Sequence, residues 1–291
     1  KITPIHKKGA RNSLDNYRPI CLYSNLGKLF ESIIHQQFSV HLERILPDNV
    51  YGFRSGRGTQ DAVGNLLDSI HKHRANNKYV ALLTLDASSA FDVIDHSIIT
   101  QSLKVTGAGP NMMKLTESFL NGCLNFVQVG DAKSDPWFVD TGSGQGRRLS
   151  PDYYNLATMS QAIFCILSEF FGYADDGGDV IHGDSKESCN KAIKLVLEQR
   201  VKWFRNIGLA LNPKKTELMG FNFIPDQVTI GDVIINAKSE ITFLGVKIQS
   251  DLKWTSHVSS LCAKIRGAAG RIRSDGRHLR VSDKRTLYQD R

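Results

Sequence analysis

Apolar residues recur at helical spacing in several parts of the chain, and apolar runs between them predict strands. Ser24 or Asn25 offers an N-cap, and the residues after it predict a helix whose core-facing stripe is Leu26, Leu29, Phe30, Ile33, Ile34, Phe38, Leu42 and Ile45. The same spacing predicts a helix over 62–70 and another over 188–208, which Gly208 ends. An apolar helical stripe also runs into the C-terminal tail.

Strands are predicted by apolar runs that end at turn residues. The run 79–85 is continuously apolar and ends at Asp86, which is typical of a buried strand that presents a carboxylate at its end. Two strands over 170–174 and 180–182 flank a turn made of Asp175, Asp176, Gly177 and Gly178. Short β segments are predicted over 125–129, 137–139, 217–221, 228–235 and 241–248. The pattern therefore predicts an α+β chain with a helical end.

Composition narrows the class of protein. The chain has 291 residues, of which 41% are hydrophobic, so a packed core is expected. Lys and Arg exceed Asp and Glu by 37 to 29, a formal net charge of +8 that favours a polyanionic partner. The tail from Lys253 holds ten basic residues against three Asp, or +7. Five scattered cysteines exclude a zinc module and fit a reducing compartment, and no apolar run is long enough to span a membrane.

Carboxylates at strand ends are the strongest chemical signal. Asp86 and the pair Asp175-Asp176 would lie on neighbouring strands if these strands share a sheet. Three converging carboxylates can hold two Mg²⁺ ions about 3.5–4 Å apart, an arrangement that catalyses phosphoryl transfer. Asp and Gly are also what a plain hairpin turn prefers, so the pair alone leaves both interpretations open.

Three ordered motifs favour the catalytic interpretation. They cover 85–96, 145–151 and 173–176, the last being Tyr-Ala-Asp-Asp. A single four-residue motif is weak, whereas three in order are specific. With further matches at 16–20, 52–59, 208–216 and 243–246, the chain resembles almost end to end the reverse transcriptase of a non-LTR (LINE-type) retrotransposon.

The resemblance implies a fold, an activity and partners. It implies a right-hand polymerase with fingers over 1–80, a palm with an antiparallel sheet over 81–240, and a primer-grip hairpin with a partial basic thumb over 241–291. The implied enzyme is an RNA-directed DNA polymerase that extends a DNA primer with dNTPs on an RNA template, using two Mg²⁺ ions or, alternatively, Mn²⁺. No membrane partner is expected. The chain would be part of a longer polyprotein with endonuclease or other modules, located in the nucleus and in cytoplasmic ribonucleoprotein particles of a eukaryotic host.

Residue roles follow from the matched positions. The resemblance makes Asp86, Asp175 and the Ala87 carbonyl the metal ligands, with Asp176 beside them. Lys215 is the candidate acid for the pyrophosphate leaving group, although a solvated surface lysine is the rival interpretation. Phe91 is the candidate steric gate, which would exclude a ribose 2′-OH. Gln145 and Gly146 would lie under the template and the incoming nucleotide. Arg54 and Arg18 are the candidate contacts of the triphosphate.

Some of these residues have plainer alternatives. Phe91 could be an ordinary core aromatic, and Arg18 could pack or contact the template backbone. The primer grip is assigned to Phe243, Leu244 and Gly245, and the duplex-tracking surface to Lys264, Arg266, Arg271 and Arg273, where a merely solvated helix face is the alternative. His71 and His73, two apart at a polar helix end, are expected to be solvated.

The sequence departs from the family pattern at three places. Gly144 replaces the usual proline and is expected to loosen the template loop. Asp152-Tyr153-Tyr154 replaces an apolar pair, and Gly177-Gly178 follows the Asp pair where a Thr or apolar residue is usual. These departures keep open a decayed or co-opted palm that binds nucleic acid without catalysis. A group II intron or telomerase type of reverse transcriptase is a second alternative, and a viral RNA-dependent RNA polymerase is disfavoured.

Overall fold

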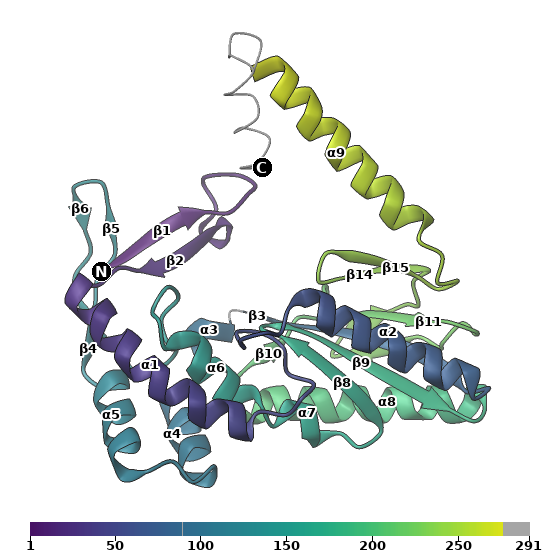
Figure 1. Ribbon diagram of the computed structural model, residues 1–291, viewed down its shortest axis with the longest axis horizontal. Coiled ribbons are helices and arrows are strands. Elements are labelled where there is room, and N and C mark those ends of the chain that lie inside the picture. The colour runs from purple at the N-terminus through teal and green to yellow at the C-terminus, as the bar shows by residue number, and fades with distance from the viewer. Residues whose placement is uncertain (89, 276–291) are drawn as a thin grey trace.

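The computed structural model describes residues 1–88 and 90–275, and an antiparallel sheet lies at its centre (Figure 1). Strand β3 (Tyr79–Ser88) pairs with β9 (Asp176–Gly183), which pairs with β8 (Ser168–Tyr173). The opposite edge of β3 pairs with β10 (Ala210–Leu211) at one end and with β11 (Glu217–Gly220) at the other. The mixed helix and sheet architecture confirms the predicted α+β class.

Helices cover both faces of this sheet (Figure 1). Because side chains alternate along a strand, Val80 and Leu82 of β3 face α2 (Thr59–Ala75), whereas Ala81 and Leu83 face α8 (Lys186–Asn206). Each helix contributes its buried stripe, with Leu66 and Ile70 in one core and Ile193 and Val196 in the other. The continuous apolar run in β3 is therefore explained by burial on both faces.

The remaining helices and strands surround this core. Helix α6 (Ser150–Thr158) is almost wholly buried and packs against α1 (Asn25–Ile45) and α4 (His96–Val105). The other helices are η1 (Leu14–Asn16), α3 (Ala90–Val93), α5 (Pro110–Leu120), α7 (Gln161–Phe164) and α9 (Thr255–Asp275). Two-stranded ribbons are formed by β1 (Ile2–His6) with β2 (Tyr17–Cys21), β4 (Cys123–Asn125) with β7 (Trp137–Val139), β5 (Gln128–Val129) with β6 (Ala132–Lys133), β12 (Val228–Ile230) with β13 (Val233–Ile235), and β14 (Glu240–Phe243) with β15 (Val246–Gln249).

The predicted hairpin turn is shorter than expected. The turn consists of Ala174 and Asp175, while Asp176 already begins β9 and the two following glycines lie inside the strand. A Cβ on Gly172 or Gly177 would lie 2.6 or 2.8 Å from the Phe170 ring. Gly177 therefore serves packing within the sheet, as Gly172 does, whereas the sequence had assigned Gly177 and Gly178 to the turn.

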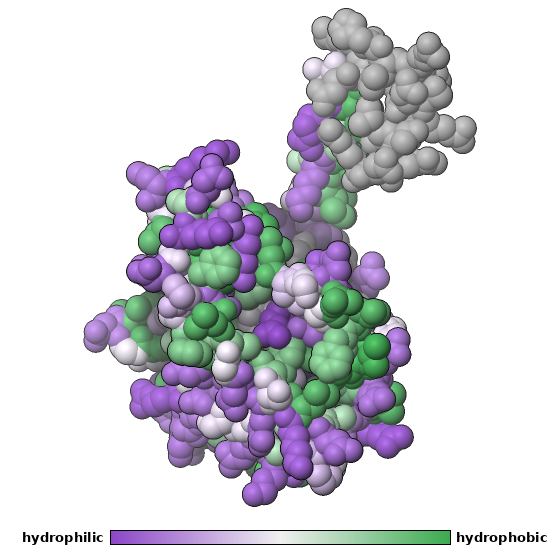
Figure 2. Space-filling model, turned by 90° about the vertical axis from the view of Figure 1, so that its left-hand side faces the viewer, coloured by the Kyte–Doolittle hydropathy of each residue, from purple (hydrophilic) through white to green (hydrophobic). Residues whose placement is uncertain are grey.

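The apolar stripe predicted for α1 is only partly buried. Ser24 caps the helix as predicted, since its Oγ accepts a hydrogen bond from the Gly27 N–H at 3.1 Å. The residues that reach the core are Ile34, Phe38 and Leu42, whereas the side chains near the helix start are 54–79% exposed, namely Leu26, Leu29, Phe30 and Ile33. Figure 2, which looks at the left-hand side of the view in Figure 1, shows hydrophobic residues gathered on this side of the molecule.

Helix α9 extends away from the sheet (Figure 1). Its apolar side chains Val258, Leu261 and Ile265 are 41–66% exposed, so they add little to the core. The predicted basic tail is placed only as far as α9, and residues 276–291 lie outside the described residues. Within the described ranges, none of the helices combines the length and the hydropathy that crossing a membrane requires.

A buried ion pair joins α8 to the central hairpin. Arg200 and Asp179 are both fully buried, with Nε–Oδ2 and Nη2–Oδ1 distances of 2.8 and 2.6 Å. Ser168 Oγ donates to Asp179 Oδ1 at 2.7 Å, and Arg200 Nη1 donates to the Gln161 carbonyl. The Arg200 guanidinium also lies 4.8 Å from the centre of the Phe170 ring. Both charges are thus paired and hydrogen-bonded.

Replacing Asp179 by Ala should destabilise the fold by about 3–5 kcal/mol, because the Arg200 charge would stay buried without its partner. Lys253→Ala, which removes an exposed ion pair of 3.8 Å with Asp251, is the matched control and should cost less than about 1 kcal/mol. Urea unfolding of both variants measures the difference. Equal losses would contradict the assigned role of the buried pair.

Candidate active site

Two aspartates face each other across the central strand pair. Asp86 lies near the end of β3, directly opposite Asp176, the first residue of β9. Asp175 precedes it in the turn, next to Ala174, whose φ of 54° lies in the left-handed region. Burial of residues 81–85 fixes β3 in the core, so the register with β9 brings the three carboxylates to one end of the sheet.

The electrostatics of this end indicate a concentrated negative charge. Burial, followed by the charges of Asp175 and Asp86, raises the pKa of Asp176 to about 6, and Lys215 opposes the shift. Burial also raises the pKa of the Tyr154 hydroxyl, and the same three carboxylates reinforce it. A set of oxygen ligands without His or Cys suits a hard cation such as Mg²⁺ or Mn²⁺. The residues present therefore fit a divalent metal.

Lys215 is the cation beside this acidic end. Its Nζ donates to Asp86 Oδ1 and Oδ2 at 2.9 and 3.0 Å, while its side chain stays 60% exposed. Asn212 positions the loop, because its N–H donates to the Asp86 carbonyl and its own carbonyl accepts from the Lys215 N–H at 3.2 Å. The structure therefore brings the exposed Lys215 side chain to the predicted aspartate, and its role as an acid stays a prediction.

Phe91 is held by aromatic contacts. Its ring stacks on Tyr154 with centroids 4.6 Å apart and meets the Phe53 ring edge-on at 5.9 Å. The Phe91 carbonyl accepts from the Ser143 N–H at 3.0 Å. Ala87, the residue after Asp86, pairs with Leu211 in the sheet. The ring is thus fixed on a helix that begins two residues after the end of β3.

The loop that carries Gln145 and Gly146 connects several elements. Gln145 Nε2 donates to Asp92 Oδ2 at 2.7 Å, and the Gln145 carbonyl accepts from the Cys21 N–H at 2.8 Å. Gly146 has a φ of 95°, and a Cβ there would lie 3.1 Å from the Ile20 side chain. Burial raises the pKa of Asp92, and its bond from Gln145 opposes the shift. The loop is therefore fixed between β2 and α3.

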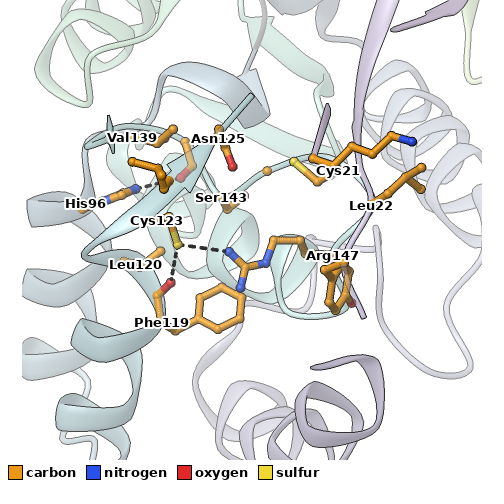
Figure 3. Close-up of a pocket in the computed structure, with 15 residues that line it drawn as sticks. Cys21, Leu22, His96, Phe119, Leu120, Cys123, Asn125, Val139, Ser143 and Arg147 are labelled. Atoms are coloured by element: carbon orange, nitrogen blue, oxygen red, sulfur yellow. Dashed lines mark hydrogen bonds between the residues drawn. The ribbon is translucent and has the colours of Figure 1, made fainter. Parts of the chain in front are cut away.

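Glu31 of α1 is a positioning residue that sequence reasoning missed. Its buried carboxylate accepts from Arg147 Nε at 3.1 Å, from the Arg148 N–H at 2.8 Å and from the Tyr23 hydroxyl at 2.9 Å. The Arg147 guanidinium also lies 3.6 Å from the centre of the Phe119 ring. Figure 3 shows Arg147 beside Phe119 and Cys123 in a pocket of about 230 Å³ behind the loop.

Gly52 and Asn155 hold the aspartate turn from the other side. A Cβ on Gly52 would lie 2.4 Å from the Ala174 nitrogen, so only glycine permits this approach. The Gly52 carbonyl accepts from the buried Asn155 Nδ2 at 2.8 Å. The glycine-rich loop over 52–59 was the signal in the sequence for this close approach. Nothing in the loop indicated that Gly52 contacts Asn155, 103 residues later.

The structure contradicts two predicted contacts. Arg54 cannot serve a triphosphate, because its side chain is 3% exposed and is bonded to the Glu43 carboxylate and to the Pro47 and Val50 carbonyls. Phe243 cannot touch nucleic acid, because it is buried in the core against Gly178 and Leu66. Both side chains fold inward, since a carboxylate and carbonyls satisfy the guanidinium and apolar neighbours cover the ring.

The other predicted binding residues lie at the surface. Leu244 and Gly245 form the tip of the β14–β15 hairpin with φ values of 49° and 83°. Arg18 is exposed on β2, and α9 exposes its basic side chains Lys264, Arg266, Arg271 and Arg273. Leu244 is half-buried against the core and the others are exposed, and the roles of all of them stay predictions.

The departure at Asp152 is accommodated within the core. The buried Asp152 carboxylate lies 2.5 Å from His35 Nδ1, and burial raises its pKa while His35 opposes the shift. The ring of Tyr154, two residues later, stacks against the Phe91 ring. The polar substitutions thus have partners within the structure.

Comparisons with known proteins point to one family. Residues 5–248 match the family model described as reverse transcriptase (RNA-dependent DNA polymerase). The RNA-directed DNA polymerase from mobile element jockey of Drosophila funebris is 26% identical over 85% of this chain and 28% of its own length. A retrovirus-related Pol polyprotein from the type-1 retrotransposable element R1 of Bradysia coprophila is 26% identical over 90% of the chain and 26% of its own length. The chain thus spans less than a third of these relatives.

A solved structure shows the same fold. Apo telomerase from Candida tropicalis, truncated from the C-terminal domain, superimposes with a TM-score of 0.62 at 15% identity. The superposition covers 87% of this chain and 53% of the telomerase chain. The likeness confirms the predicted right-hand polymerase fold.

The raised pKa of Asp176 predicts a pH-dependent stability in metal-free buffer. Because its native pKa of about 6 exceeds the ordinary 3.8, the native state keeps a proton that the unfolded state releases. Stability should therefore fall as the pH rises from about 4 through 6. Asp176→Asn should melt at a higher temperature than the unmodified protein at about pH 7.5 and at the same temperature at about pH 4.

Calorimetry in EDTA measures this effect. Asp232→Asn, at an exposed turn, is the matched control and should change neither melting temperature. An equal gain for Asp176→Asn at both pH values would show that the substitution acts through packing rather than charge.

Proposed function

The chain belongs to the reverse transcriptase (RNA-dependent DNA polymerase) family, and on that premise we propose that it extends the 3′-OH of a DNA primer with dNTPs on an RNA template. The opposition of Asp86 and Asp176, with Asp175 in the adjoining turn, carries this proposal. The retrotransposon relatives favour a non-LTR element over the group II intron type as its source. Its enzyme class is nucleotidyltransferase.

Asp86, Asp175 and the Ala87 carbonyl are the proposed ligands of two divalent cations, Mg²⁺ or Mn²⁺. Members of this family generally use divalent metal ions. When bound, such ions lower the pKa of the attacking hydroxyl and neutralise charge on the leaving group. Asp176, whose pKa is raised beside these ligands, contributes negative charge to the same end of the sheet.

Lys215 is the proposed proton donor to the pyrophosphate. Its ammonium reaches both Asp86 oxygens from an exposed loop, so it can follow a charged group that approaches from solvent. A proton transferred from Nζ neutralises the leaving oxygen as the bond to the primer forms. The contact with Asp86 supports this role over that of a solvated lysine.

Phe91 is the proposed gate against ribonucleotides. Tyr154 and Phe53 support its ring from two directions, so the ring cannot move aside without losing both contacts. A ribose 2′-OH directed at such a ring would lose its hydration and clash. Phe91 can therefore be packed against other aromatic rings and still act as a gate.

The remaining assignments concern nucleic acid. We assign fingers to 1–80, palm to 81–240 and the primer-grip hairpin with the start of a thumb to 241–291. Gln145 and Gly146 would support the template, Arg18 the triphosphate, and Leu244 with Gly245 the primer end. The exposed basic side chains of α9 suit a duplex backbone and imply strongly salt-dependent binding. A longer polyprotein, ribonucleoprotein particles and the nucleus are the proposed context.

Primer extension with Mg²⁺ and dNTPs on an RNA template tests the activity. Asp175→Asn should lower the rate by at least about 10³-fold, because it removes a charge that the cation requires. Asp232→Asn, on an exposed turn, is the matched control and should extend normally. Undiminished extension by Asp175→Asn would overturn the metal assignment. Duplex binding by the unmodified protein without any extension would favour the non-catalytic binding module.

Phe91→Ala should let ribonucleotides in. Removal of the ring should raise ribonucleotide incorporation relative to dNTPs by about 10–100-fold, since the clash with the 2′-OH disappears. The ratio of kcat/KM for the two sugars measures the change. Phe53→Ala, which removes only the edge contact, should give a smaller increase, and an unchanged ratio in Phe91→Ala would remove the gate assignment.

A further inference from the structure

Two histidines and a glutamate meet at the end of the hairpin remote from the aspartates. His73 lies in the last turn of α2, Glu169 in β8 and His182 in β9. His73 Nε2 and Glu169 Oε1 are 2.6 Å apart, and the two imidazole rings stack with centroids 3.8 Å apart. One possible ligand atom from each residue lies within 4.8 Å of the others. Among the described residues, this is the group of three His, Cys, Asp or Glu side chains that is close enough to hold a metal ion.

This cluster corrects an expectation and is separate from the proposed active site. His73 was expected to be solvated, but its side chain is only 12% exposed because it packs against the sheet. His182 follows Asp176 by six residues along β9, which at about 3.3 Å per residue places it roughly 20 Å from the aspartates. His71, two residues before His73, is exposed as expected.

The glutamate is oriented by a third residue. Ser69 Oγ donates to Glu169 Oε2 at 2.8 Å, which leaves Oε1 directed at His73. Such an outer hydrogen bond orients carboxylate ligands in metal sites. Burial raises the pKa of Glu169, but the bonds from His73 and Ser69 outweigh it, so the pKa lies below its usual value.

Other titratable groups surround the cluster. Burial, followed by the neighbouring His73, lowers the pKa of His182. The charged groups around the cluster are Lys72, Lys78 and Asp184, and Lys78 is paired with Asp184. The nearby lysines oppose a bound cation, and the Glu169 and Asp184 carboxylates offset them.

We propose that His73, Glu169 and His182 bind a divalent transition-metal ion of the Zn²⁺ class, which clips α2 to the β8–β9 hairpin. Two imidazoles and a carboxylate are the protein ligands of many zinc sites, with water completing the coordination. Imidazole nitrogen disfavours Mg²⁺, so this site and the carboxylate site select different ions. The clip would strengthen the packing between a helix and the hairpin that also carries the aspartates.

Calorimetric titration with Zn²⁺ in excess Mg²⁺ tests the proposal, because Mg²⁺ occupies oxygen sites and leaves imidazole sites free. The 291-residue chain should bind Zn²⁺, and the melting temperature should rise by about 5 °C at saturating Zn²⁺. His182→Gln and Glu169→Gln should each weaken the affinity by about tenfold or more and remove the thermal shift. Ser69→Ala should weaken it by about tenfold.

The matched control is His71→Ala, which removes an exposed histidine from the same helix and should bind Zn²⁺ normally. Co²⁺ provides a second readout, since the visible absorption of a Co²⁺ ion bound by imidazole should appear in the control and disappear in His182→Gln. Circular dichroism without metal verifies that each variant is folded. No binding by the unmodified protein, or undiminished binding by both Gln variants, would overturn the proposal.

Discussion

A shift of one residue between β3 and β9 would separate Asp86 from Asp176 and turn every apolar side chain of β3 to the wrong core. The register is fixed because both faces of β3 are buried, one by α2 and the other by α8. Glycines at 172, 177 and 178 allow the Phe170 ring and Leu66 to approach the strands closely. Arg200 then joins α8 to Asp179 in the middle of β9. The geometry of the acidic end is thus set by contacts well away from it.

The same hairpin has two chemically different ends. Three carboxylates gather where β3 and β9 emerge beside the turn, and burial together with their mutual repulsion raises the pKa of Asp176. At the other end, imidazole and carboxylate meet beside α2. Hard oxygen ligands and softer nitrogen ligands discriminate between cations by chemistry alone. Although the formal net charge is +8, the centre of the protein is strongly acidic, and basic side chains lie on α9 and on the loops around this centre.

The sequence predicted what depends on local pattern and missed what depends on distant partners. The strand that ends in Asp86 was predictable because a continuous apolar run requires burial on two faces. The contact of Arg54 with Glu43 was not predictable, since a guanidinium binds a phosphate and a carboxylate equally well. His73 looked solvated because its partners Glu169 and His182 lie about a hundred residues later. The apolar stripe correctly predicted helix α1, but no local pattern shows how many of the stripe's side chains other elements will bury.

The template loop shows how the fold accommodates a departure from its family pattern. Gly144 has a φ of 74°, which a proline with its φ near −65° cannot adopt, so this loop follows a path that requires glycine. Glycine costs additional entropy on folding, yet the Gly144 carbonyl accepts from Ser150 Oγ at 2.5 Å and Arg147 is bound to Glu31. The expected loosening is therefore offset within the folded protein. Because Ser143 also donates to the Phe91 carbonyl, a displacement of this loop would be transmitted to the ring beside the aspartates.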